Sequence, residues 1–177
     1  MSTHTDRHNT TRTLRRVGLV AAASGLIVGA GFASEYALAA HFITGPATYE
    51  TLPGVVLYIG AVLALAALLA VIATESRRGI GRRGFDVSLI AVSAVGVLFF
   101  GWLALLGAQF AAGAATDETG STWLLYLASF AAPAFASLVA AIVIYVWHPR
   151  AIVPALIVLG IVAVAVVLLV VQSTVPA

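Results

Sequence analysis

The chain has 177 residues, of which 62% are hydrophobic and only 9% charged, and its formal net charge is +2. Soluble domains carry roughly a quarter charged residues, so this balance excludes an ordinary soluble domain and is typical of a membrane protein. The sequence contains no cysteine and no lysine, which excludes disulfides, thiolate metal ligands and lysine Schiff-base chemistry.

Residues 1–13 are polar and show no periodic pattern, so we predict a disordered tail there. Five apolar segments follow in chain order, at residues 17–43, 53–73, 87–115, 123–147 and 151–171. A segment of ~20 apolar residues suffices to cross the hydrocarbon core, and backbone groups in lipid must be bonded within their own segment. The sequence therefore predicts an all-α integral membrane protein, a bundle of five transmembrane helices.

The nine arginines indicate an orientation. All of them fall on one side of the predicted spans: Arg7, Arg12, Arg15, Arg16, Arg77, Arg78, Arg82, Arg83 and Arg150. Because arginine is enriched in cytoplasmic loops, we predict a multi-pass plasma-membrane protein with a cytoplasmic N-terminus and an extracytoplasmic C-terminus.

The basic loop at residues 77–86 contains Arg77, Arg78, Arg82 and Arg83. We interpret these four arginines as a topology anchor that can also attract anionic lipid headgroups. No basic fold or aromatic platform accompanies the loop, so nucleic acid is not an expected partner.

Two loops of the chain resemble each other. Residues 40–58 and 108–126 are identical at nine of 19 aligned positions, at an offset of 68 residues. The same offset places the first span on the third and the second on the fourth, in the same orientation. We therefore predict two tandem helical hairpins, at residues 14–76 and 87–148, followed by a fifth helix and a short outer tail at 149–177. Chance similarity between two alanine-rich segments is the alternative.

The first span contains a ladder of small residues, one at every fourth position. Its members are Ala21, Gly25, Gly29, Ala33 and Ala37. Small residues let helix backbones approach closely, so we expect the ladder to be a packing seam.

The repeated loops supply the candidate site. Glu50 and its repeat partner Glu118 precede the second and fourth spans, and pseudo-symmetry would bring them together with His41 and Gln109 in an outward-facing pocket for a cation or an amine. Glu35, a carboxylate within the first span near the outer edge of the hydrocarbon core, is a further candidate, and a hydrated interfacial carboxylate without a function is the alternative. Helix capping by the repeated Thr-x-Glu-Thr is the alternative explanation for Glu50 and Glu118.

No catalytic motif, cofactor motif or metal-ligand set accompanies these residues. We therefore expect a non-enzymatic accessory or interaction subunit of a larger membrane assembly, whose partners are the lipid bilayer and another membrane protein or further copies of itself. The alternative is a small transporter or channel that uses the duplicated outer loops as a cation or solute site.

Overall fold

The computed structural model describes residues 3–34, 37, 52–78, 82–112 and 119–174, and the regular structure in these ranges is α-helical. The helices are α1 (Thr3–Ser34), α3 (Leu52–Arg78), α4 (Arg82–Ala112), α5 (Thr119–Trp147) and α6 (Ile152–Thr174). The predicted all-α class is therefore confirmed.

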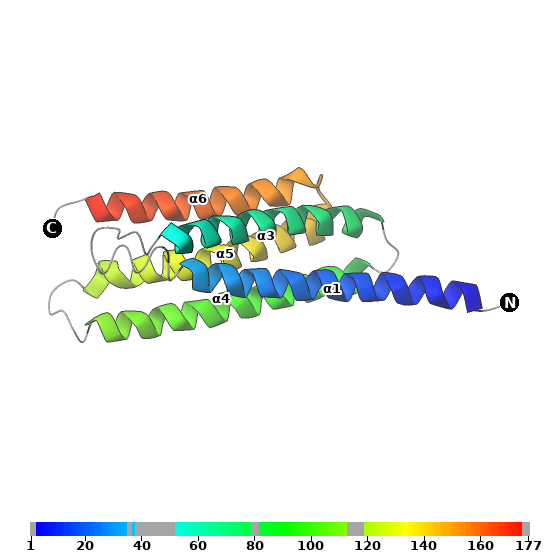
Figure 1. The fold of residues 1–177 in the computed structure, drawn as a ribbon, viewed down its shortest axis with the longest axis horizontal. Helices are drawn as coiled ribbons and strands as arrows, with labels where there is room; N and C mark the ends of the chain where they lie inside the picture. The colour runs from blue at the N-terminus through cyan, green and yellow to red at the C-terminus, as the bar shows by residue number, and fades with distance from the viewer. Residues whose placement is uncertain (1–2, 35–36, 38–51, 79–81, 113–118, 175–177) are drawn as a thin grey trace.

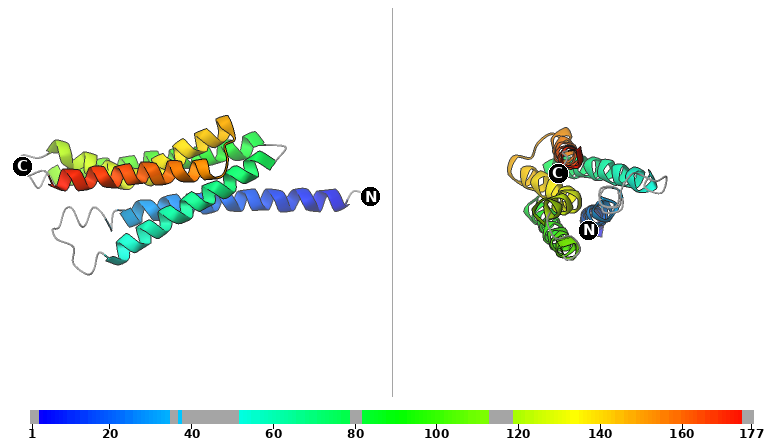
Figure 2. Two further views of the ribbon diagram at one scale, coloured as in Figure 1. Left: turned by 90° about the horizontal axis from the view of Figure 1, so that it is seen from above. Right: turned by 90° about the vertical axis from the view of Figure 1, so that its left-hand side faces the viewer.

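The helices lie side by side along one long axis (Figure 1). The start of α1, the facing ends of α3 and α4, and the link between α5 and α6 lie at one end of the molecule. α5 packs between α4 and α6, while α3 packs against α1 and α6. The view from the end shows that α1 is not enclosed by the other helices (Figure 2). It contacts α3, α4 and α5 and leaves the rest of its surface open.

Three helices are long and apolar enough to cross a membrane. The qualifying stretches are Thr13–Ser34 with 22 residues, Pro53–Arg77 with 25 and Gly84–Leu106 with 23. Shorter apolar stretches occur at Ala131–Trp147 in α5 and Ile152–Leu168 in α6. The part of the chain that the structure describes thus supports membrane association through at least these three helices.

The N-terminal segment differs from the predicted disordered tail, because α1 already begins at Thr3. Nucleating a helix is the costly step, whereas each residue added to an existing helix gains one backbone hydrogen bond. The apolar stretch from Thr13 supplies the nucleus, and the polar residues before it extend the same helix.

The sequence predicted that the small-residue ladder forms one packing seam. The structure contradicts this prediction. Ala33 and Ala37 are buried, whereas Ala21, Gly25 and Gly29 are exposed. At 3.6 residues per turn, a step of four residues advances about 40° around the helix, so five such positions sweep about 160°. A straight neighbour cannot follow that sweep, and the ladder turns from the outside of the molecule to its interior.

The packing of α1 on its neighbours depends instead on two glycines. A Cβ atom added to Gly31 would overlap the ring of Phe100, which is fully buried on α4. A Cβ atom on Gly96 of α4 would lie 2.9 Å from Cγ2 of Ile27 and 3.4 Å from Cβ of Ala134 on α5. Bare backbone at these two positions therefore lets α1, α4 and α5 approach one another closely.

An aromatic cluster surrounds the contact between Gly31 and Phe100. Phe32 meets Phe100 edge to face at a centroid distance of 5.7 Å and Phe99 at 6.5 Å, and Phe99 and Phe100 lie 5.2 Å apart. Edge-to-face pairs at these distances add stabilisation beyond the area they bury. The cluster thus fixes the end of α1 against α4.

The end of α5 is set by His148, which has a φ of 45°. Its N–H donates to the carbonyl of Ile144 at 3.1 Å, which satisfies one of the last free carbonyls of the helix. Pro149 follows, and a proline disfavours helical geometry in the residue before it. α6 therefore starts afresh at Ile152.

We predict that Gly31→Ala lowers the free energy of unfolding by about 1–3 kcal/mol, because the new methyl group must displace the Phe100 ring. Gly29→Ala is the matched control, since nothing lies within 4 Å of its would-be Cβ. That control gains helix propensity and is expected to be neutral or stabilising. Equilibrium unfolding in mild detergent measures both, and equal effects of the two substitutions would contradict the packing described.

Candidate functional site at the arginine-rich end

Most residues of the predicted acidic pocket lie outside the part of the chain that the structure describes. Glu35, His41, Glu50 and Glu118 lie outside the described residues, as do the central parts of the two repeated loops. Gln109 is described and is exposed on α4. The acidic pocket therefore stays a prediction.

The four arginines of the basic loop lie where α3 ends and α4 begins (Figure 1). Arg77 is exposed near the end of α3 and Arg78 is its last residue, while Arg82 and Arg83 open α4. The structure places the start of α1 and the link containing Arg150 at the same end.

A buried hydrogen bond joins α3 to α4 beside this loop. The hydroxyl of Ser76 donates to Oδ2 of Asp86 at 2.9 Å, and both residues are 1% exposed. A carboxylate away from water is costly unless it is hydrogen-bonded. The contact therefore fixes the end of α3 to the first turns of α4.

An ion pair joins α1 to α3 through Glu75, the residue before Ser76. Nη1 of Arg15 lies 2.9 Å from Oε1 of Glu75. The Arg15 side chain is 61% exposed, so water screens the pair and its contribution to stability is small. Its main effect is to orient the two helices at the polar end.

Arg16 is placed differently from Arg15. Its guanidinium carbon lies 5.7 Å from the centroid of the Phe85 ring on α4, within the range of a cation–π contact. Nε of Arg16 is buried and has no hydrogen-bond partner among the described residues. A buried donor without an acceptor is costly, so this N–H is a local cost of the contact between Arg16 and Phe85.

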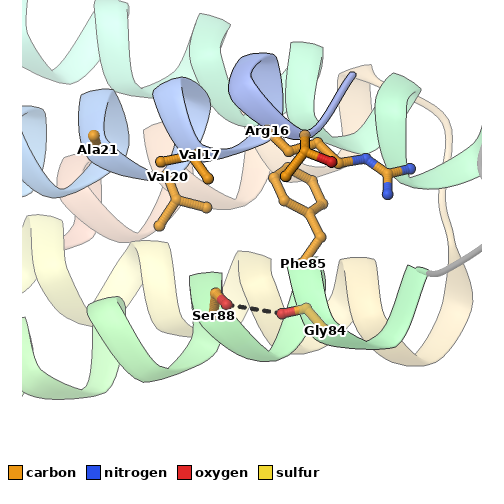
Figure 3. A pocket seen from close by; sticks show the side chains of 8 residues that line it. Arg16, Val17, Val20, Ala21, Gly84, Phe85 and Ser88 are labelled. Atoms are coloured by element: carbon orange, nitrogen blue, oxygen red, sulfur yellow. Dashed lines mark hydrogen bonds between the residues drawn. The ribbon is translucent and has the colours of Figure 1, made fainter. Parts of the chain in front are cut away.

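Arg16 and Phe85 border a pocket between α1 and α4 (Figure 3). The pocket has a volume of about 490 Å³, and valines and small residues form much of its remaining wall. The hydroxyl of Ser88 lies in the same wall and donates to the carbonyl of Gly84 at 2.8 Å. A second cavity of about 360 Å³ lies farther along the same two helices and includes Ile27 and Phe99.

This cluster could not be recognised while residues 77–86 were interpreted only as a basic loop that anchors the topology and attracts lipid headgroups. Two signals were present: Glu75 and Asp86 are the acidic residues that bracket the loop, and Asp86 is directly followed by an apolar run. A carboxylate next to an apolar run needs a partner, and an apolar helix end only 10 residues earlier offers Ser76. Arg16 over Phe85 depends on the crossing of α1 and α4 and had no signal in the sequence.

The cluster combines internal pairing with a cation beside a pocket. Asp86 and Glu75 are held by Ser76 and Arg15, whereas Arg16 lines the pocket. Among the residues that the structure describes, no group of three or more histidine, aspartate or glutamate side chains could hold a metal ion. The chemistry that the cluster offers is anion recognition beside an apolar wall.

Fold and site together define an all-helical protein with three candidate membrane-spanning helices and a polar cluster at its arginine-rich end. Comparison with protein-family models, with curated proteins and with solved structures finds no match for this chain.

We predict that Ser76→Ala lowers the free energy of unfolding by about 1–3 kcal/mol, because it removes a donor from a buried carboxylate. Ser88→Ala is the control at the same end, since that exposed hydroxyl bonds only within its own helix. A change of no more than about 0.5 kcal/mol is expected there. If the two variants unfold alike in detergent, the bond between α3 and α4 does not have the role assigned to it.

Proposed function

We propose that this chain is a five-span plasma-membrane protein with a cytoplasmic N-terminus, and that it acts as a non-enzymatic accessory or interaction subunit. α5 has 29 residues and α6 has 23, and at 1.5 Å per residue both exceed a hydrocarbon core of ~30 Å. The arginines whose helix positions are described gather at one end of the molecule, as the positive-inside rule requires.

A duplicated origin is part of this proposal, and one contact supports it. The offset of 68 residues pairs Phe32 with Phe100, and the rings of these two residues meet at a centroid distance of 5.7 Å. Residues related by a two-fold axis meet each other when they lie next to that axis. The same operation would exchange α1 with α4 and α3 with α5, and both of these pairs are in contact.

The observation that carries the accessory role is an outward face of small residues on α1. Gly18, Ala22, Gly25 and Gly29 are exposed, and nothing lies within 4 Å of a Cβ atom added to any of the three glycines. Their spacing of four, three and four residues keeps them on one side of the helix. We call these four residues the small-residue face.

A small-residue face suits a partner helix better than lipid alone. Transmembrane helices associate through van der Waals packing of close backbones, which small side chains permit. A glycine inside a helix costs about 0.5–1 kcal/mol relative to alanine, and no contact with the described part of the chain offsets that cost at these positions. A helix of another subunit, or of a second copy, would offset it.

We predict that Gly25→Leu abolishes co-purification of the partner in mild detergent, because leucine keeps the partner backbone at a distance. Gly160→Leu on α6 is the matched control, since its would-be Cβ also has nothing within 4 Å. Both variants should keep the unfolding temperature of the parent. The accessory role is rejected if the parent carries neither another protein nor a second copy, or if both substitutions leave the association intact.

The transport alternative rests on the predicted pair Glu50 and Glu118, and a separate measurement addresses it. Under that alternative, cation flux into proteoliposomes exists and is lost in the double variant Glu50→Gln plus Glu118→Gln. The accessory role predicts no flux from the purified chain alone. Flux that survives in the double variant would argue against the acidic pocket while leaving transport itself established.

A further inference from the structure

Two cavities between α1 and α4 follow one another along the helices. The first is lined by residues 13–21 of α1 and 84–88 of α4, and the second by residues 24–28 and 91–99. The sequence positions advance together because α1 and α4 run in the same direction (Figure 1). We call these two cavities together the α1–α4 groove.

The groove is polar at one end and apolar at the other. Arg16 lines the cavity at the arginine-rich end, and the wall of that cavity also includes the hydroxyl-bearing Ser88. The farther cavity is walled by Ile27, Val95 and Phe99, with Ser24 as its hydroxyl-bearing member. A ligand that fills the groove therefore needs an anionic end and a long apolar tail.

The length of the apolar part matches one membrane leaflet. Val17 and Val28 lie 11 residues apart on α1, which corresponds to about 16 Å of helix. Half of a hydrocarbon core of ~30 Å is about 15 Å. Val17 lies next to Arg16, so the apolar wall begins where the charge ends.

We propose that the α1–α4 groove binds one anionic phospholipid from the leaflet at the arginine-rich end. The phosphate pairs with the guanidinium of Arg16, and an acyl chain lies along the wall between Val17 and Val28. A phosphate fits because the arginine fork is the preferred partner of phosphate oxygens. This site goes beyond the proposed function and requires no protein partner.

Charge complementarity favours a lipid over a partner helix as the occupant. The carbonyls inside a helix already accept hydrogen bonds within that helix, so the middle of a partner helix would offer no acceptor to the Arg16 guanidinium. The small-residue face lies roughly 140° around α1 from the groove, so the two surfaces can be occupied at the same time. An anionic headgroup at this depth also belongs to the interface where arginine attracts anionic lipid.

The test is a lipid titration followed by native mass spectrometry of the full chain in mild detergent. Dioleoylphosphatidylglycerol and dioleoylphosphatidylcholine carry the same acyl chains, so they differ in the headgroup alone. We expect one tightly bound phosphatidylglycerol and about fivefold weaker binding of phosphatidylcholine. Inorganic phosphate at the same concentration should not displace the lipid, because it lacks the apolar tail.

Two variants with matched controls locate the site. Arg16→Gln should weaken phosphatidylglycerol binding about fivefold and remove the headgroup preference, whereas Arg150→Gln, an equal charge change at the same end, should not. Ala91→Phe fills the apolar cavity and should weaken both lipids, whereas Ala163→Phe, on the exposed surface of α6, should weaken neither.

The proposal is overturned if the parent shows no headgroup preference, if Arg16→Gln and Arg150→Gln behave alike, or if Ala91→Phe leaves binding unchanged. The Ala91→Phe arm does not depend on Arg16, so it decides the question even if Arg16→Gln fails to fold. A stoichiometric polypeptide cross-linked to the groove wall in place of lipid would also overturn it.

Discussion

The contact between the Phe100 ring and the bare backbone of Gly31 determines how α1 lies on the rest of the molecule. With Gly96 beneath Ile27, it draws the last turns of α1 close to α4 and α5. The middle of α1 is held by Arg15 on Glu75 and by Arg16 on Phe85. Between these attachments α1 and α4 leave the α1–α4 groove open, and the small-residue face of α1 points away from the chain.

Each of the two open surfaces of α1 offers a different chemistry. The α1–α4 groove combines a cation with an apolar wall, and these complement the anionic headgroup and the acyl chain of a phospholipid. The small-residue face carries no charge and lets the backbone of another helix approach closely, so it suits a partner helix. A lipid held in the groove would pack beside a partner on the adjacent face and would make α1 the surface through which this subunit joins an assembly.

Much of the fold follows from hydropathy, because backbone hydrogen bonding in lipid leaves few alternatives to a helix. The all-α class and the start of α3 beside Pro53 could be predicted in this way. The inward face of α1 could not be predicted, because residues spaced by four rotate progressively around the helix. The close approach at Gly31 also depends on the ring of Phe100, which lies 69 residues later in the chain. Ser76 and Asp86 escaped prediction for the same reason, since only the packing of α3 on α4 reveals that they meet.

The seating of α1 on α4 is the central claim, and cross-linking within the membrane tests it most directly. The chain contains no cysteine, so the pair Phe32→Cys and Phe100→Cys is unique for a short thiol-reactive cross-linker. The structure predicts rapid intramolecular cross-linking, because the two rings lie 5.7 Å apart. The pair Leu63→Cys and Phe100→Cys, with Leu63 exposed on α3, should react far more slowly. Equal rates for the two pairs, or no product from the first, would contradict the arrangement of α1 and α4.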